Sequence, residues 1–417
     1  MLYYLFRYFE YLGIPGSGMW SYISFRSLGA FMLALLLSWK LGKWFITYMV
    51  SHRNRFEEKK FDESVDPVAA KRKYIPSMGG CVIIVSTVAT CLLFGRLRNI
   101  YLLLILVTTI WLGITGFADD LLKIKRSKNG LAAHWKLLSQ LGIGIIVGLT
   151  LYLSPDAVIR ENVVSQNSNG VSVIVHKSEA KKSTITTIPF VKSHNLDYSL
   201  IESQEIGWIV FVAVTIFFIM FTSNGVNLND GVDGMAAGNS AIVFTALAIL
   251  AYVSSHIGFA AYLNIMYIPG IQELVVFAFA MIGALIGFLW HNVHPAKMYM
   301  GDTGSLAIGG AIAVLAVIIH KEILLFILCG IFVIELASSK LQTWYSIWGT
   351  KHGRKQRLFK RAPLHDAYRT GYEFDNSIKY VFRHHLCGND EDQKVTVHFW
   401  IISILLAAFT IISLKIR

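Results

Sequence analysis

Long apolar runs recur along almost the whole chain, and they restrict its fold more than any other feature. About ten of them have, or nearly have, the length that a helix needs to cross roughly 30 Å of hydrocarbon. We place them near 23–50, 78–96, 99–118, 134–154, 206–223, 235–256, 272–290, 304–320, 322–345 and 396–415. Of the 417 residues, 54% are hydrophobic and 15% are charged, whereas soluble proteins carry about 25% charged residues. We therefore expect an all-α polytopic membrane protein, with residues 1–417 forming a single membrane domain.

Two of these spans are less regular than the others. The run at 304–320 is short, and the run at 322–345 contains Glu335 and Lys340. A charged side chain within a span is costly in lipid, so Glu335 is a candidate functional residue. A buried, hydrogen-bonded strut would explain Glu335 equally well.

Lysine and arginine are distributed unevenly over the loops between these runs. If all of these spans form, the loops at 51–77, 119–133 and 346–395 share one side and carry most of the basic residues. The positive-inside rule then places these loops in the cytoplasm and both termini outside. The net charge of +12 suits anionic lipid headgroups or phosphorylated substrates. Since no segment resembles a nucleic-acid-binding module, we expect no nucleic-acid partner.

A long loop at 155–205 falls on the opposite, outer side. It holds two β-like runs, VSVIVH at 171–176 and TITTIPF at 184–190, which we expect to pair as one small β-hairpin. The opening stretch MLYYLFRYFEYLGIPGSG is aromatic and carries Glu10, which is unlike a signal peptide and predicts a helix lying in the membrane interface. The four cysteines include no CxxC pair, so the sequence supports neither a disulfide framework nor a zinc site.

The polar stretch SNGVNLNDGVDGMAAG at 223–238 lies between two apolar runs and carries groups that membrane helices normally avoid. Asn227, Asp230 and Asp233 are spaced three apart, which on a helix puts them on neighbouring turns of one face. The glycines among them let a ligand approach the backbone closely. The stretch therefore predicts a site for a polar ligand or a metal.

Further unusual stretches fall on the same predicted side: KRKYIPSMGG at 71–80, GFADDLLKIKRSKNG at 116–130 and WHNVHPAKMYMGDTGSLAIGG at 290–310. In the second of these, Asp119 and Asp120 are about 100° apart on a helix, so they cannot easily share one ligand face. Desolvation of both would make one of them a candidate proton acceptor. The alternative is a solvated helix end with an i,i+4 pair of Asp119 and Lys123.

The segment GDTGS at 301–305 resembles an anion-binding turn. Its glycines free the backbone, and Thr303 or Ser305 can cap the following helix, whose N–H groups would attract phosphate. Asp302 could hold Mg²⁺, which typically takes one or two carboxylates and completes its shell with water and phosphate oxygens. An ordinary capped loop explains the motif equally well.

The histidines and one tyrosine near these motifs each allow two interpretations. His291 and His294 flank a membrane boundary, and His365 lies in RAPLHDAY. A lone interfacial histidine is more often structural, and these lack the spacing of a zinc-binding helix. Tyr299 could stack on a base or simply pack.

Taken in order, PSMGG, GFADD, SNGVNLNDGVDGMA, MYMGDTGSLAIGG and APLH resemble the motifs of the polyprenyl-phosphate sugar-1-phosphate transferases. Within this superfamily the chain is most similar to the phospho-N-acetylmuramoyl-pentapeptide transferases. The resemblance implies a ten-helix fold, periplasmic termini, Mg²⁺ dependence, and a homodimer in the bacterial cytoplasmic membrane with its active site facing the cytoplasm. The implied substrates are UDP-MurNAc-pentapeptide and undecaprenyl phosphate, and the implied products are lipid I and UMP.

The resemblance also implies roles for single positions. Asp119, Asp120 and Asp302 match the catalytic acidic residues, with Asp302 as the Mg²⁺ ligand and the first carboxylate of the adjacent pair as a plausible base. The nucleotide-binding positions, including an aromatic residue expected to stack on uracil, are Asn227, Asp230, Asp233, Asn292 and Tyr299. The phosphate-binding positions are Arg72, Lys73, Lys123, Lys136 and Ser305. We accordingly expect the metal on the GDTGS turn, across from the 223–238 stretch.

The chain departs from the family pattern in one region. The family's run of three histidines reads His365-Asp366-Ala367 here, and the segment at 369–394 is longer than usual. Any role of the second and third histidines therefore cannot be transferred. A UDP-GlcNAc:polyprenyl-phosphate GlcNAc-1-phosphate transferase would share the aspartates and is the nearer alternative. An ion-coupled transporter would need ionisable residues near the bilayer midplane and matching halves, which this sequence lacks.

Overall fold

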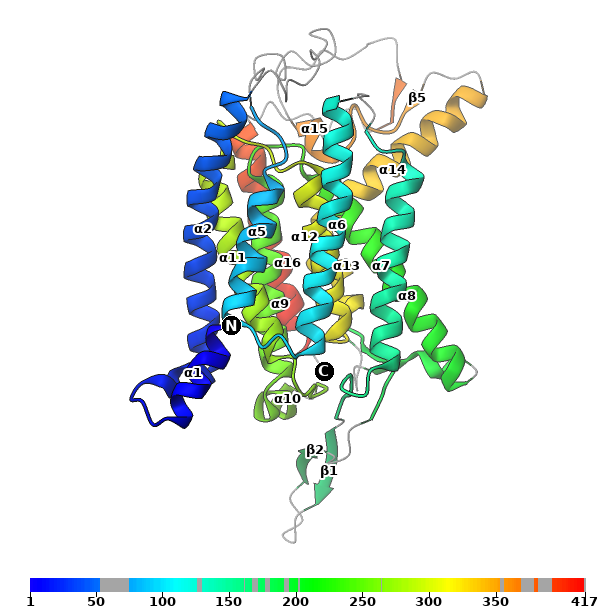
Figure 1. Ribbon diagram of the computed structural model, residues 1–417. Helices are drawn as coiled ribbons and strands as arrows, with labels where there is room; N and C mark the ends of the chain where they lie inside the picture. Colours follow the sequence, from blue (N-terminus) through cyan, green and yellow to red (C-terminus); the bar gives the residue numbers. More distant parts are fainter. Residues whose placement is uncertain are drawn as a thin grey trace.

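Long helices form a bundle in the computed structural model, which describes residues 1–52, 75–125, 130–160, 162–166, 172–176, 181–190, 195–201, 203–263, 265–352, 356–368, 379–381 and 392–415 (Figure 1). Within these residues, 8 helices are long and apolar enough to cross a membrane. They are α2 (Ile23–Ser51), α6 (Ile100–Lys125), α7 (Ala133–Leu153), α8 (Gln204–Asn229), α9 (Met235–Ser254), α11 (Gln272–Asn292), α12 (Gly301–Ile318) and α16 (Asp392–Ser413). Each coincides with a predicted span, which confirms the all-α polytopic fold.

Two predicted spans differ from straight membrane helices. The helix α5 (Gly80–Phe94) is apolar but only 15 residues long. The span predicted at 322–345 is a bent pair, because α14 (Gly330–Lys351) turns by 79° from the segment formed by the 3-10 helix η3 (Glu322–Leu324) and α13 (Leu325–Leu328). The bent helix places Glu335 against α15 (Leu364–Tyr368), where its carboxylate is hydrogen-bonded instead of facing hydrocarbon.

The helix α12 lies at the centre of the bundle beside α6 and α8, and 94% of its residues are buried. Glycines bring its backbone into direct contact with neighbouring helices. A Cβ atom on Gly116 of α6 would lie 2.1 Å from the carbonyl oxygen of Asp302, and one on Gly80 of α5 would lie 2.1 Å from the nitrogen of Gly304. These contacts fix the start of α12 against the last turns of α6, where the adjacent aspartates lie.

The two ends of the bundle carry different structures. The acidic end, as we call it, holds the last turns of α6 and the first turn of α12, and nearby β5 (Gln356–Arg357) pairs in parallel with β6 (Lys379–Tyr380). The distal end, opposite to it, carries α1 (Leu2–Tyr11), η1 (Ser17–Ser21) and α10 (Ile257–Leu263) (Figure 1). The helix α1 confirms the predicted N-terminal helix, while its position in a membrane interface stays a prediction.

The loop predicted at 155–205 also lies at the distal end and holds two hairpins where one was expected. β1 (Asn162–Gln166) pairs with β2 (Ser172–His176), and β3 (Ile185–Thr187) pairs with β4 (Asn195–Asp197), both antiparallel. The predicted pairing of 171–176 with 184–190 is wrong, because each run has a partner across a shorter connection, which antiparallel pairing permits. The β1–β2 hairpin projects from the bundle, and η2 (Tyr198–Ile201) leads into α8 (Figure 1).

Candidate active site

Three aspartates from two helices meet at the acidic end. Asp119 and Asp120 lie near the end of α6, Asp302 lies on the first turn of α12, and all three are buried. One oxygen atom of each lies within 4.8 Å of the others. Asp119 and Asp120 were not expected to share one ligand face of a helix easily, yet both lie in one cluster, because Asp302 comes from a separate helix and reaches both.

Two lysines bridge these carboxylates. Nζ of Lys123 lies 2.7 Å from Asp119, 3.0 Å from Asp302 and 3.7 Å from Asp120. Nζ of Lys136, on α7, lies 2.9 Å from Asp119 and 2.6 Å from Asp302. The predicted pair of Asp119 and Lys123 thus forms, but inside a buried cluster instead of at a solvated helix end. Three carboxylates thus face two ammonium groups, so the ionised cluster has one more negative than positive charge and would attract a cation.

Asp120 also caps α12 from the neighbouring helix. Its oxygens accept hydrogen bonds from the backbone nitrogen of Asp302 at 3.2 Å and from the nitrogen and Oγ1 of Thr303 at 3.0 and 2.7 Å. A carboxylate is favoured at this end of a helix dipole. The sequence reasoning missed this contact, which replaces the predicted capping by Thr303 or Ser305. Oγ of Ser305 donates within α12 at 3.1 Å, and its contact with phosphate stays a prediction.

Asp230 holds the same turn by its first residue. The nitrogen of Gly301, which has a φ of 74°, donates to Oδ2 of Asp230 at 3.2 Å. Burial, together with the nearby carboxylate of Asp302, raises the pKa of Asp230 well above its usual range. The first N–H groups of the GDTGS turn are therefore engaged by carboxylates of the protein, so among the described residues of this cluster the groups left to meet a phosphate are Lys123 and Lys136.

Asp233 faces a different partner from Asp230. The helix α8 ends before residue 230, and Gly234 has a φ of 76° ahead of α9. The prediction that Asn227, Asp230 and Asp233 share one helical face is therefore wrong, since only Asn227 lies on the helix. Oδ2 of Asp233 lies 2.9 Å from Nδ1 of His294. The sequence reasoning missed this pair, although His294 was singled out.

The loop that follows α11 braces the turn at 230–234. Oδ1 of Asn292 accepts from the nitrogen of Gly234 at 3.0 Å, and its Nδ2 donates within its own loop at 2.9 Å. Tyr299 is half-buried, and its backbone pairs with the SMGG segment; the nucleotide contacts of both residues stay predictions. Nε2 of His291 lies 3.0 Å from the carbonyl oxygen of Trp39. This contact favours the structural interpretation of His291.

Glu335 positions His365 beside the same turn. The nitrogen and Nδ1 of His365 lie 3.1 and 3.0 Å from the Glu335 carboxylate, and both residues are buried. The other ring nitrogen of His365 reaches the turn, because a Cβ atom on Gly231 would lie 2.1 Å from it. Glu335 is thus a hydrogen-bonded strut whose effect is to place a histidine near the candidate site.

Known proteins are similar to this chain over its whole length. Residues 102–320 match the family described as Glycosyl transferase family 4. The chain is 54% identical over 427 residues to the phospho-N-acetylmuramoyl-pentapeptide-transferases of Phocaeicola vulgatus and Bacteroides fragilis, and 44% identical over 429 residues to that of Porphyromonas gingivalis, with 100% of both chains covered each time. The chain belongs to the phospho-N-acetylmuramoyl-pentapeptide transferase family.

Membership of the phospho-N-acetylmuramoyl-pentapeptide transferase family confirms the resemblance seen in the motifs and favours the muramyl reading over the GlcNAc alternative. Two of the predicted phosphate-binding residues, Arg72 and Lys73, lie outside the described residues. Lys136, another of the predicted phosphate-binding residues, contacts two of the three aspartates. The family resemblance is the sequence signal that linked Lys136 to this site, since its position on α7 carries no local motif.

The three aspartates fit the Mg²⁺ that this transferase family implies. Their donors are carboxylate oxygens, which Mg²⁺ prefers, and Mg²⁺ commonly uses one or two of them with substrate phosphates. Asp302 is the most exposed of the three at 8%, whereas Asp120 is held by the start of α12. Asp302 is accordingly the residue that would hold the metal.

Proposed function

We propose that this transferase moves phospho-MurNAc-pentapeptide from UDP-MurNAc-pentapeptide to undecaprenyl phosphate, making lipid I and releasing UMP. Full-length identity of 54% to phospho-N-acetylmuramoyl-pentapeptide-transferases supports this function. The structural observation that carries it is the buried cluster of three aspartates and two lysines at one end of the spanning helices. A lipid phosphate and a water-soluble nucleotide can meet at such an edge.

The lysines have the contacts needed to receive phosphate oxygens. In the reaction an oxygen of the lipid phosphate attacks the sugar-linked phosphorus, and the bond from that phosphorus to the UMP oxygen breaks. Negative charge spreads over the oxygens of the transferring group. Nζ of Lys123 and Lys136 lie 3.0 and 2.6 Å from Asp302, and an ammonium group can exchange one anionic partner for another because it is a compact point charge.

The aspartates divide the remaining work. Mg²⁺, when bound at Asp302, supplies charge neutralisation to the pyrophosphate oxygens. Asp120 accepts hydrogen bonds from the first residues of α12 and so fixes the position of Asp302 relative to α6. Asp119 is fully buried and faces both lysines, and we assign it as the base that takes a proton from the lipid phosphate.

The turn at 230–234 and the loop after α11 form the proposed nucleotide side. Asp233 and His294 are hydrogen-bonded there, and Tyr299 lies on the same loop as His294. We assign the uracil and ribose contacts to Asn227, Asp233 and Tyr299. Asn292 holds the two segments together, and Asp230 joins them to the GDTGS turn.

The proposal includes a location and an oligomeric state. The helices that flank the basic segments predicted at 51–77, 119–133 and 346–395, among them α2, α6 and α14, have the adjoining ends at the acidic end (Figure 1), so the positive-inside rule puts that end in the cytoplasm. The protein would then reside in the bacterial inner membrane with its site facing the cytoplasmic nucleotide pool. We further propose that it forms a homodimer, as the family resemblance implies.

An assay of UMP release tests the function and the metal assignment together. The purified full-length chain is given undecaprenyl phosphate and Mg²⁺ with either UDP-MurNAc-pentapeptide or UDP-GlcNAc. Only the muramyl substrate should release UMP, and Asp302→Asn should lower the rate at least about 100-fold because the metal supplies several kcal/mol of charge stabilisation.

The matched control is Asp156→Asn, which removes an exposed aspartate at the distal end and should keep the normal rate. Preference for UDP-GlcNAc would overturn the substrate assignment. Normal lipid I formation by Asp302→Asn would overturn the role of Asp302 alone.

A further inference from the structure

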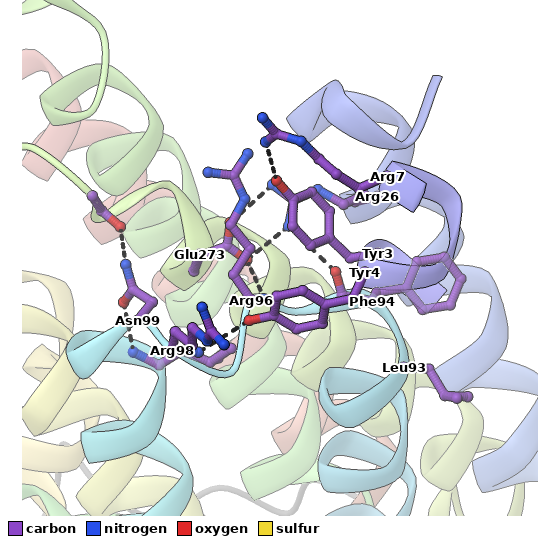
Figure 2. Close-up of polar contacts among 12 residues, drawn as sticks. Tyr3, Tyr4, Arg7, Arg26, Leu93, Phe94, Arg96, Arg98, Asn99 and Glu273 are labelled. Carbon is purple, nitrogen blue, oxygen red and sulfur yellow. Dashed lines mark hydrogen bonds and ion pairs between the residues drawn. The ribbon is translucent and has the colours of Figure 1, made fainter. Parts of the chain in front are cut away.

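Four arginines gather at the distal end around the N-terminal helix α1 (Figure 2). The ring of Tyr3 lies between two of them, with the Arg26 guanidinium carbon 4.9 Å and the Arg96 guanidinium carbon 4.6 Å from its centroid. Nη1 of Arg7 donates to the hydroxyl of the same tyrosine at 2.9 Å. One tyrosine thus organises three guanidinium groups, which is an unusual concentration of positive charge so far from the acidic cluster.

A single buried carboxylate balances part of this charge. Arg26 makes two bonds to Glu273, at 2.7 and 2.9 Å, and both residues are buried. The backbone nitrogen of Arg96 donates to the same carboxylate at 2.9 Å, and its Nε lies 3.4 Å away. Arg26 therefore has a dedicated partner, whereas Arg96 shares it and keeps 36% of its side chain exposed.

Two further arginines face solvent. Arg7 and Arg98 are both exposed, and the backbone of Arg98 is tied to α1 through the Tyr4 hydroxyl at 3.2 Å. Among the described residues, Glu273 on α11 contacts Arg26 and Arg96, and Glu10 on α1 lies near Arg7. Four arginines against these two glutamates leave two positive charges. This surplus is available to an anion from outside the chain.

The position of these groups indicates which anion. Several spanning helices begin or end at this level: α2 begins at Ile23, α5 ends at Phe94 and α11 begins at Gln272. On α1, Leu5, Tyr8 and Tyr11 are exposed by 46%, 59% and 87%. An amphipathic helix with exposed aromatic and aliphatic side chains at the ends of spanning helices lies in the interface between headgroups and acyl chains.

We propose that Arg7, Arg96 and Arg98, together with the exposed face of α1, bind the phosphate headgroup of an anionic phospholipid from the leaflet at the distal end. We call this surface the α1 patch. Guanidinium groups match phosphate oxygens geometrically, and the exposed side chains of Leu5 and Tyr8 offer contact to the acyl chains. A free phosphate ion would use only the arginines, so the apolar rim favours a lipid.

The test measures lipid binding by the delipidated, full-length protein with native mass spectrometry. Phosphatidylglycerol and phosphatidylcholine are titrated separately, and the dissociation constant of the first bound lipid is determined. The double variant Arg7→Gln/Arg98→Gln should weaken phosphatidylglycerol binding about 30-fold, since it removes two basic residues and each contributes about 1 kcal/mol near a membrane surface. Phosphatidylcholine carries the same phosphate but no net charge, so its binding should weaken much less than that of phosphatidylglycerol.

Three controls make the result decisive. Lys181→Gln removes an exposed cation from the same end outside the patch and should change binding less than about twofold. Arg7→Lys/Arg98→Lys keeps the charge and should retain most of the affinity. UMP release by the double Gln variant should stay normal, which shows that the protein is folded.

Unchanged phosphatidylglycerol binding by the double Gln variant would overturn the proposal. An equal loss in Lys181→Gln would overturn it too, because the attraction would then be diffuse. Displacement of the lipid by millimolar inorganic phosphate would assign the arginines to a free anion instead of a lipid headgroup, and would also reject the proposal as stated.

Discussion

The two ends of the bundle bury charged groups in different ways. At the acidic end, two lysines share three carboxylates, and their side chains remain 31% and 19% exposed. At the distal end, Arg26 donates two hydrogen bonds to the carboxylate of Glu273, and the side chains of Arg26 and Glu273 are 0% and 2% exposed. A lysine is a point charge that can change partners, whereas the planar arginine fork fixes one geometry. The comparison suggests an exchangeable cluster for chemistry and a locked pair for structure.

Breaking the locked pair should have the largest effect on stability. Glu273→Ala leaves the Arg26 guanidinium buried without its partner, so the free energy of unfolding should fall by about 3–5 kcal/mol. Thermal unfolding in detergent measures this loss. The double replacement Arg26→Met/Glu273→Leu should recover most of the stability because it removes both charges. UMP release per folded molecule should be normal in both variants. A loss of turnover would contradict the assignment of the Arg26–Glu273 pair to structure alone.

A second buried charge at the distal end should appear in the pH dependence of stability. Burial lowers the pKa of Lys321 to about 8, and its Nζ donates only to the neutral hydroxyl of Thr187 at 3.3 Å among the described contacts. Between pH 8 and the unfolded pKa of about 10.4 the unfolded state binds more protons at this lysine, so stability relative to Lys321→Met should rise with pH by up to about 3 kcal/mol. Lys321→Met should lack this rise, and an unchanged slope would contradict the assignment.

At the acidic end, removal of a lysine should affect turnover more than stability. Lys136→Met leaves Lys123 to bridge the carboxylates, so the unfolding temperature should fall less than in Glu273→Ala, where the buried Arg26 loses its carboxylate partner. The rate of UMP release should fall about 100-fold, or about 2.7 kcal/mol, because a charge facing the phosphates is lost. Lys40→Met, which removes an exposed lysine of α2, is the matched control. Turnover within a few-fold of normal would make Lys136 structural.

The smallest of these effects should come from the turn at 230–234. A Cβ atom on Gly231 would meet Nε2 of His365 at 2.1 Å, so Gly231→Ala should displace the histidine. We expect KM for UDP-MurNAc-pentapeptide to rise about tenfold, equivalent to about 1.4 kcal/mol, with modest loss of stability. Gly258→Ala is the control, because its Cβ would come no closer than 3.6 Å to another atom. An unchanged KM would show that the position of His365 does not affect substrate binding.

The sequence predicted the elements that depend on local patterns. Apolar runs located the spanning helices, and the GFADD and GDTGS motifs located all three aspartates of the cluster. It could not predict the pairing of Arg26 with Glu273, because nothing local links residues 247 positions apart. The turn that separates Asp230 from Asp233 depends on Gly234 at φ 76°. The sequence does not reveal this backbone conformation, so the three-residue spacing alone predicts a helix. The two hairpins and the bend before α14 likewise follow from packing partners.

The contact between Gly116 and the backbone of Asp302 has a consequence for how this enzyme can vary. Where two main chains touch, no side-chain rotamer remains to absorb a shift between the helices. The distance between Asp119 and Asp302 is thus set directly by the distance between the axes of α6 and α12. A single methyl group added at position 116 would push the two helices apart and so change the reaction without altering any reactive atom. Substitution of this glycine is therefore not tolerated, whereas positions on the lipid-facing side of α6 can vary.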